Sequence, residues 1–166
     1  MYAIGIIFSA IRILYAEYEC ETEWITFNVT GYQYKWDCVK PISLGSGKGA
    51  NFYEAEGKCQ EMKGHLVSIH NDEENDFVAD LIGSDKEYHT WIGLQRTENR
   101  SVWRWTDGSE MDFSKWDIDQ PDGSPNDKDN CAHIYNVIRG EPLDREKKWN
   151  DALCYWSEYY VCKKRA

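Results

Sequence analysis

Apolar side chains recur at every third or fourth position in two stretches of the chain, residues 51–64 and 71–83. This spacing places them on one face of an α-helix, and a glycine ends each stretch. The apolar positions are Phe52, Ala55, Cys59 and Met62 in the first stretch, and Phe77, Val78, Leu81 and Ile82 in the second. Asn71 and Glu74 stand at the start of the second stretch as the two members of a capping pair do. The pattern therefore predicts two amphipathic helices.

Apolar and aromatic residues elsewhere occur in short runs bounded by turn residues, which is typical of β-strands. The runs are residues 24–36, 65–70, 90–94, 101–109, 131–137 and 157–164. The first run alternates aromatic and polar residues as a small hairpin does, and Cys20 and Cys38 enclose it. Helices early in the chain and strands late indicate one α+β domain. The segment from Thr106 to Asn130 has no periodicity, and long loops of this kind are commonly functional.

Composition and charge exclude several classes of protein. The chain has 166 residues, of which 14% are aromatic, so it can build a packed core and is not disordered. Its formal net charge of -10 makes nucleic acid an improbable partner, because phosphates would be repelled. The apolar run 1–16 predicts a secretory signal peptide that leaves a mature domain of residues 17–166. A membrane anchor is the rival interpretation, but the run is short and Arg12 interrupts it, so we expect no stable membrane insertion after cleavage.

The cysteines agree with secretion. There are six of them, and an even number behind a signal sequence predicts three disulfides formed in an oxidising compartment. They are Cys20, Cys38, Cys59, Cys131, Cys154 and Cys162, and their spacing matches no structural zinc pattern. Two glycosylation sequons begin at Asn28 and Asn99, which predicts a secreted glycoprotein.

Side chains that carry oxygen gather between Asp119 and Cys154. They are Gln120, Asp122, Asn126, Asp127, Asp129, Asn150 and Asp151. Such a segment is either a solvated acidic loop or a site for a hard cation. Calcium takes six to eight oxygens from carboxylates, amides and carbonyls, whereas magnesium keeps more of its waters. A cation held here would therefore be calcium.

Eight short motifs resemble the C-type lectin-like domain, in the order of that family. They are "KCQEMKGHLVSI", "EENDFVADLI", "WIGL", "WRWTDGS", "KWDIDQPD", "DNCAHI", "KWNDALC" and "YYVCK". The resemblance covers residues 20–163 and implies an α+β fold with two helices, two small antiparallel sheets and a long loop region. It implies disulfides between Cys59 and Cys162 and between Cys131 and Cys154. The family's long form adds a third pair, which here would be Cys20 with Cys38.

The resemblance also implies a ligand site. The family positions that match Gln120, Asp122, Asp129, Asn150 and Asp151 hold one Ca²⁺ and bind sugar through the same side chains. Members with Gln-Pro-Asp bind galactose-type sugars, those with Glu-Pro-Asn bind mannose-type sugars, and the proline follows a cis bond. This chain lacks the aromatic residue that usually follows the motif in galactose binders. Asp129 stands where the family has glutamate, so Asp127 is an alternative ligand. Arg96 and Arg100 occupy positions where some members have acids for an auxiliary calcium, so we expect that second site to be absent.

No motif points to catalysis. The four histidines are scattered, none belongs to a nucleophile–base or H-E-x-x-H pattern, and the sequence predicts a protein that is not an enzyme. The tryptophans at 91, 103, 105, 116 and 149 are expected in the core, which leaves Trp156 and Tyr135 as aromatic candidates for ligand contact. The preferred function is calcium-dependent binding of glycans or glycoproteins of the galactose or N-acetylgalactosamine type. The alternative is a calcium-independent protein-binding module on the same fold. The sequence leaves the oligomeric state and the natural ligand open.

Overall fold

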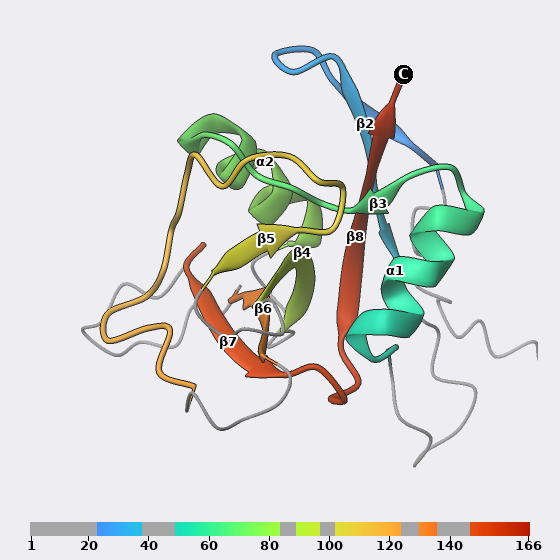
Figure 1. Cartoon of the computed structure of the whole chain (residues 1–166). Helices are drawn as coiled ribbons and strands as arrows, with labels where there is room; N and C mark the ends of the chain where they lie inside the picture. The colour runs from blue at the N-terminus through green and yellow to red at the C-terminus, as the bar shows by residue number, and fades with distance from the viewer. Residues whose placement is uncertain (1–22, 38–48, 84–88, 97–101, 124–129, 136–146) are drawn as a thin grey trace, which may run out of the picture.

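Both predicted helices form, and an asparagine caps each of them. In a computed structural model of the chain, α1 spans Phe52–Glu61 and α2 spans Asp72–Ile82 (Figure 1). Asn51 and Glu54 form a reciprocal capping box at α1, which the sequence analysis did not identify. Asn71 caps α2 by accepting a hydrogen bond of 2.8 Å from the backbone N–H of Glu74. The predicted return contact is absent among the described residues, because the side chain of Glu74 turns into the core.

The structure describes residues 23–37, 49–83, 89–96, 102–123, 130–135 and 147–166. Several predictions lie outside these ranges: the signal segment 1–16, the pairing of Cys20 with Cys38, the sequon at Asn99, and the ligand candidates Asp127 and Asp129. In the part of the chain that is described, no helix is long and apolar enough to cross a membrane.

One connected sheet holds all eight described strands. They are β1 Ile25–Phe27, β2 Tyr32–Asp37, β3 His65–Leu66, β4 Thr90–Arg96, β5 Trp103–Trp105, β6 Asn130–Ile134, β7 Trp149–Leu153 and β8 Tyr159–Arg165. The main path runs β1-β2-β8-β4-β6-β7, and β3 and β5 attach to β8 and β4. The expected two antiparallel sheets are thus joined, because β4 and β8 pair in parallel at Thr90↔Tyr159 and Trp91↔Tyr160. The α+β class is confirmed, and β7 is a strand that the sequence analysis missed.

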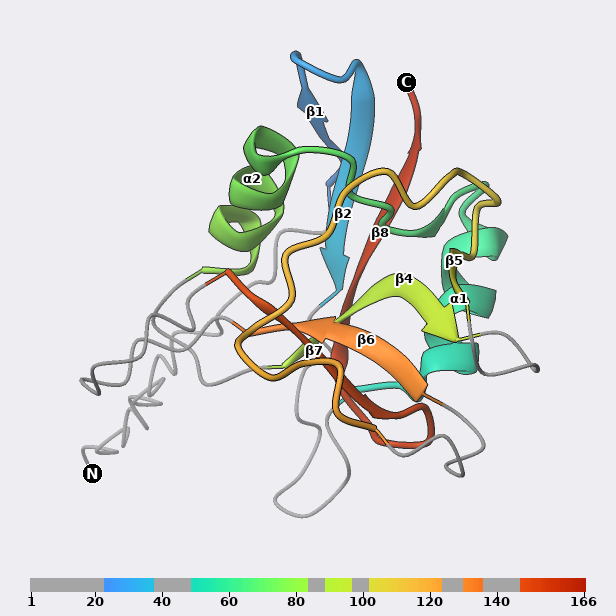
Figure 2. The ribbon, with the colours of Figure 1, turned by 60° about the vertical axis from the view of Figure 1, so that its left-hand side comes forward.

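The hairpin β1–β2 extends the sheet at the edge of β8, as Figure 2 shows at the top of the molecule. Its turn carries Asn28, which is exposed, so the first sequon is open to solvent. Thr30 of the same sequon turns back onto the hairpin, and its hydroxyl lies 2.9 Å from that of Tyr34. Glycosylation of Asn28 stays a prediction.

Two clusters of buried side chains form the core. The larger one lies between α2 and strands β4, β6 and β7 and includes Val78, Ile92 and Trp149. The smaller one lies beneath α1 and contains both disulfides of the described residues. Of the five tryptophans expected in the core, those at 91, 105 and 149 are buried, and those at 103 and 116 pack partly buried against it.

Two of the three implied disulfides are confirmed. Cys59 in α1 pairs with Cys162 in β8, and the two residues are 103 apart in sequence. Cys131 in β6 pairs with Cys154, which follows β7 after a separation of 23 residues. The first bridge ties the N-terminal helix to the C-terminal strand. The second joins the start of β6 to the end of β7, the strand that carries the candidate ligands Asn150 and Asp151.

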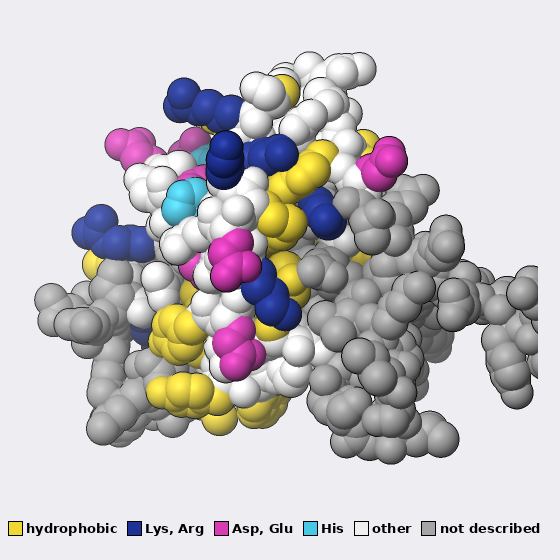
Figure 3. All heavy atoms as spheres, turned by 90° about the vertical axis from the view of Figure 1, so that its right-hand side faces the viewer, with side chains coloured by type: hydrophobic (Ala, Val, Ile, Leu, Met, Phe, Trp, Pro, Cys, Tyr) yellow, Lys and Arg dark blue, Asp and Glu magenta, His cyan; other side chains and the backbone are white. Residues whose placement is uncertain are grey.

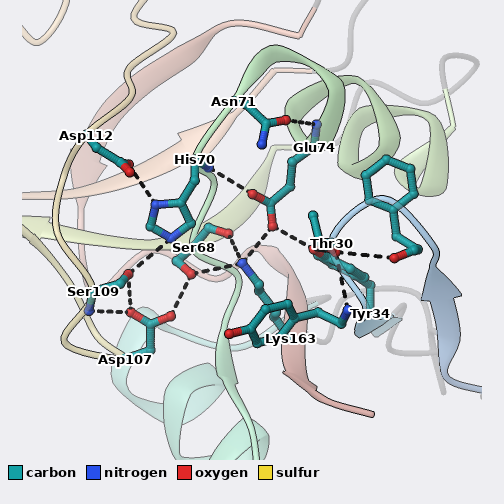
Figure 4. A network of polar contacts seen from close by, with 12 residues as sticks. Thr30, Tyr34, Ser68, His70, Asn71, Glu74, Asp107, Ser109, Asp112 and Lys163 are labelled. Carbon is teal, nitrogen blue, oxygen red and sulfur yellow. Dashed lines mark hydrogen bonds and ion pairs between the residues drawn. The ribbon is translucent and has the colours of Figure 1, made fainter.

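A buried polar network crosses the core between α2, β2 and β8 (Figure 4). Glu74 and Lys163 form an ion pair of 2.6 Å, and the exposed fractions of their side chains are 1% and 7%. The hydroxyl of Tyr34 also donates to Glu74, at 2.6 Å. Burial raises the pKa of this tyrosine, and the hydrogen bond to the carboxylate raises it further. The ammonium of Lys163 donates in addition to the backbone oxygen of Ser68, at 3.0 Å.

The outer part of this network holds the loop that leads away from β5. Asp107 accepts hydrogen bonds from the hydroxyls of Ser68 and Ser109, at 2.5 and 2.6 Å (Figure 4). Burial raises the pKa of Asp107, but these hydrogen bonds outweigh it and hold the pKa below its usual value. The ring of His70 lies 2.7 Å from the carboxylate of Asp112. The start of the long segment 106–123 is therefore fastened to the core.

Candidate functional site

The candidate site is built where the segment 113–123 runs beside β7. The backbone N–H of Trp149 donates to the oxygen of Lys115, and the N–H of Asp117 donates to the oxygen of Trp149, both at 2.9 Å. The N–H of Gln120 then donates to Asp117 at 3.1 Å and closes a turn. This turn delivers Gln120 to the residues that follow Trp149 in β7, Asn150 and Asp151.

Trp149 fixes the position of β7 against α2. Its indole N–H donates to the side-chain oxygen of Asn75 at 2.8 Å, and the amide of Asn75 donates to the backbone oxygen of Lys147 at 2.9 Å. Both side chains are fully buried. On its other edge β7 pairs with β6, with His133 opposite Asn150 and Ala132 opposite Asp151. The polar residues of β7 therefore project from a rigid strand, which suits a binding site.

Four of the five predicted ligand side chains meet. The terminal amide of Gln120 lies 3.2 Å from Oδ1 of Asp122 and 3.2 Å from Oδ1 of Asp151, and it touches Oδ1 of Asn150. The bond between Gln120 and Pro121 is cis, as the resemblance implied. Asp129, the fifth residue, lies outside the described residues. We call the four side chains of Gln120, Asp122, Asn150 and Asp151 the oxygen cluster.

The orientation of the Gln120 amide decides what the oxygen cluster can do. With its nitrogen turned inward, the amide donates hydrogen bonds to the surrounding oxygens. With its oxygen turned inward, four oxygens face one another, two of them from carboxylates, and a bound cation would relieve their repulsion. Oxygen donors of this mixed kind match the ligands of calcium. The donor set of the oxygen cluster therefore fits a calcium ion.

Asp151 also anchors the loop that contributes Asp122. Its Oδ1 accepts from the backbone N–H of Asp122 and its Oδ2 from that of Gly123, both at 3.0 Å. The amide of Asn130 donates to the same Oδ2 at 3.1 Å. The side chain of Asp151 is fully buried, so these donors replace water around its charge. Sequence reasoning missed Asn130, although its place beside Cys131 and next to a predicted ligand was a signal.

Arg96 closes the site from the side of β4. Its guanidinium stacks over Trp103, donates to the backbone oxygen of Gly123 at 3.3 Å, and lies 4.0 Å from Oδ2 of Asp151. The arginine thus steadies both the anchoring carboxylate and the loop. The absence of an auxiliary calcium at this position stays a prediction.

Gly123 leaves no room for a side chain. A Cβ atom at this position would collide with the amide of Asn130 and the carboxylate of Asp151. We expect Gly123→Ala to lower the affinity for calcium about tenfold, which corresponds to about 1.4 kcal/mol, because it displaces the anchored carboxylate. Calorimetric calcium titration measures the effect.

Gly57→Ala is the matched control for that change. A Cβ at Gly57 in α1 meets nothing within 4 Å, so the substitution should leave the affinity for calcium unchanged. It should raise the free energy of unfolding by up to about 1 kcal/mol, since alanine favours a helix over glycine. Equal calcium affinities of the two variants would contradict the role of Gly123.

The histidines are less scattered than the sequence suggested. The rings of His89 and His133 lie 4.4 Å apart between their centroids, and Tyr135 packs against both. His133 is fully buried and lies 2.9 Å from each carboxylate oxygen of Glu158. Burial lowers the pKa of His89, and the neighbouring His133 lowers it further. No sequence pattern joined these residues, because only strand pairing brings them together.

The two aromatic ligand candidates differ in their surroundings. Tyr135 lies in the ring contacts just described, whereas the exposed fraction of Trp156 is 52%. A separate open pocket lies near the C-terminus, lined by Tyr32, Lys63, Gly64, His65, Asp107, Gly108, Ser109, Lys163, Lys164 and Arg165. Figure 3 shows Lys and Arg side chains gathered in the upper part of the α1 face. This pocket shares no residue with the oxygen cluster.

Comparison with known proteins decides the family. The family model described as the lectin C-type domain matches residues 48–164. The chain belongs to the C-type lectin domain family. The resemblance carried by the eight motifs is thus confirmed. Domains of this family are non-enzymatic binding modules, so the family also confirms that the protein is not an enzyme.

Two relatives and one solved structure illustrate the similarity. The chain is 35% identical over 147 residues to an α-N-acetylgalactosamine-specific lectin of Patiria pectinifera, covering 84% of this chain and 77% of that one. It is 32% identical over 134 residues to a perlucin-like protein of Mytilus galloprovincialis, covering 78% of each. The structure of herring type II antifreeze protein aligns with a TM-score of 0.69 at 28% identity, over 89% of this chain and 99% of that one. Proteins of different activity thus share this lectin fold.

Proposed function

We propose that this C-type lectin domain binds glycans that present galactose or N-acetylgalactosamine, through one calcium ion. The observation that carries the proposal is the meeting of Gln120 and Asp122 with Asn150 and Asp151, from segments about 30 residues apart. The fold alone is a weaker argument, because the antifreeze protein shares it. The name of the Patiria lectin supports the choice of sugar.

The four side chains of the oxygen cluster would hold the calcium. Asp129 would add a third carboxylate, with Asp127 as the alternative. Bound calcium supplies a positive charge to which two neighbouring sugar hydroxyls donate their lone pairs. The amide of Gln120 would donate a hydrogen bond to one of those hydroxyls, and the carboxylate of Asp122 would accept one. An amide at position 120 and a carboxylate at position 122 favour galactose-type sugars. Their order decides on which side of the calcium the hydrogen-bond donor lies and on which side the acceptor lies.

The affinity of a single site should be weak. Asp122 is exposed and Gln120 and Asn150 are half-buried, so a sugar here touches few atoms and stays partly hydrated. Useful binding to a cell surface or a glycoprotein would then come from several sites at once. The two disulfides of the described residues agree with a secreted protein, which we propose as its location.

Affinity chromatography tests the proposal. We expect the disulfide-intact protein to stay on galactose-coated resin in the presence of calcium, to be released by chelator, and to pass through mannose-coated resin. Retention on mannose-coated resin that chelator releases would support the calcium site but contradict the proposed preference for galactose-type sugars. Absence of retention on both resins, with no calcium detected by calorimetry, would favour the calcium-independent protein-binding alternative.

Exchange of the two motif residues tests the choice of sugar separately. The double variant Gln120→Glu with Asp122→Asn reverses the positions of amide and carboxylate. We expect its preference to shift toward mannose, measured as the ratio of sugar concentrations that elute half of the protein. An unchanged ratio would show that other residues select the sugar.

A further inference from the structure

Three side chains that commonly bind metals meet where β4 and β8 begin. His89 precedes β4, Glu158 precedes β8, and His133 lies in β6. They come together because β4 pairs with both neighbours, through Trp91↔His133 on one side and Thr90↔Tyr159 on the other. One ligand atom from each of the three lies within 4.8 Å of the others.

The distances suit a small ion with nitrogen ligands. Nδ1 of His133 lies 2.9 Å from both oxygens of Glu158, and Nδ1 of His89 lies 3.8 Å from Oε1. Around a tetrahedral zinc ion with bonds of about 2.0–2.1 Å, neighbouring ligand atoms are about 3.3 Å apart. The two distances lie on either side of that value, so small side-chain shifts would admit the ion.

Burial and access are those of a binding site with one open side. The side chains of His133 and Glu158 are 0% and 6% exposed, whereas that of His89 is 42% exposed. Tyr135 packs edge-on against the ring of His89, at 5.1 Å between centroids, and at the same distance from the ring of His133. These contacts restrict the rings, and the exposed histidine offers a path from solvent.

We propose that His89, His133 and Glu158 bind a divalent transition-metal ion of the zinc type. Two imidazoles and one carboxylate are ligands that zinc accepts, with water in the fourth position. Calcium would avoid this cluster because it prefers an all-oxygen shell. The site is distinct from the oxygen cluster in its ligands, and it does not depend on the sugar-binding function.

A purely structural role would need only two of the three residues. The hydrogen bond between His133 and Glu158 satisfies a buried ring and a buried carboxylate by itself. His89 packs on the ring of His133 but is not needed to satisfy the polar atoms of that pair, and 42% of its side chain is exposed. The three-residue geometry, rather than the buried pair, is what points to a metal.

Metal titration of the disulfide-intact protein, without a histidine tag, tests the site. After chelator treatment and dialysis, calorimetry with Zn²⁺ should give one saturable site per chain, and Co²⁺ should give the visible absorption of a tetrahedral complex. We expect His89→Ala to weaken zinc binding at least about tenfold, because it removes one of three ligands. This variant leaves the buried pair of His133 and Glu158 intact, so it should fold normally, as circular dichroism would verify.

His65→Ala is the matched control, because the side chain of His65 is also 42% exposed and also contacts a glutamate, Glu56. It should leave zinc affinity unchanged. Equal losses in both variants would mean that zinc binds surface histidines at random, which would overturn the proposal. An equally large loss in Asp122→Asn would place the ion in the oxygen cluster and would overturn it as well.

Discussion

Replacing Glu74 with alanine is expected to lower the free energy of unfolding by about 3–5 kcal/mol, the usual cost of leaving one member of a buried ion pair alone. Lys163, which is 7% exposed, would lose its only carboxylate contact at 2.6 Å among the described residues. The hydroxyl of Tyr34 would lose its acceptor, and the backbone N–H of His70 would lose a bond of 2.9 Å. The cost is large because the hydrogen bonds from the Tyr34 hydroxyl and the Lys163 ammonium to Glu74 are buried.

Urea unfolding with the disulfides intact measures this change. Asp80→Ala is the control, because that α2 carboxylate is 73% exposed and pairs only at the surface, with Lys147. It should cost no more than about 0.5 kcal/mol. Adding Lys163→Met to Glu74→Ala should recover part of the stability, since the uncompensated charge is then gone. A loss below about 1 kcal/mol for Glu74→Ala would contradict the role given to the pair.

Replacing Asp151 with asparagine is expected to weaken calcium binding at least about 100-fold. A hydrogen bond to a charged group contributes about 1.5–3 kcal/mol, and each 1.4 kcal/mol is a factor of ten in affinity. The variant loses a ligand charge, and its new amide group would face the N–H donors of Asp122 or Gly123. The loop that carries the Gln-Pro-Asp motif would then lose its anchor.

Calorimetric titration with calcium measures the loss. Asp80→Asn removes a carboxylate at the surface of α2 and should leave the affinity for calcium within a factor of two or so of the unchanged protein. Circular dichroism and the urea midpoint establish that the Asp151→Asn chain is folded. Tight calcium binding by that folded variant would show that calcium does not bind at β7, which would contradict the proposed site.

The helices could be predicted because their signals are local. Asn71, the apolar stripe and Gly83 lie within one segment, and the structure places the ends of α2 at those residues. The cap from Asn71 to the N–H of Glu74 was predicted, but not the partners of the Glu74 carboxylate. It binds the backbone N–H of His70 and also Tyr34 and Lys163, which are 40 and 89 residues away in sequence. Strand β7 was missed for a related reason. Its polar residues Asn150 and Asp151 interrupt the alternation of a strand, and tertiary contacts rather than propensity hold them there.

The candidate site likewise contains residues that could be predicted from the sequence and residues that could not. The motif residues Gln120, Asp122, Asn150 and Asp151 were identified from family positions, and the structure brings their oxygens together. Gly123 and Asn130 were not identified, because their roles depend on the space around one carboxylate, which no sequence pattern encodes. The meeting of His89, His133 and Glu158 could not be predicted either, because it depends on which strands become neighbours in the sheet.

The ring of His133 ties the two proposed ion sites together. A neutral imidazole carries one proton, and here Nδ1 faces Glu158 while Nε2 lies 3.1 Å from the amide nitrogen of Asn150. In the tautomer with the proton on Nδ1, Nε2 would accept from the amide of Asn150, and the Asn150 oxygen would face the oxygen cluster. A metal held by Nδ1 would leave the proton on Nε2, and the amide of Asn150 would have to turn over so that its oxygen accepts that hydrogen bond. If both proposed ions bind, they would then be antagonists, and each would lower the affinity for the other by the same factor.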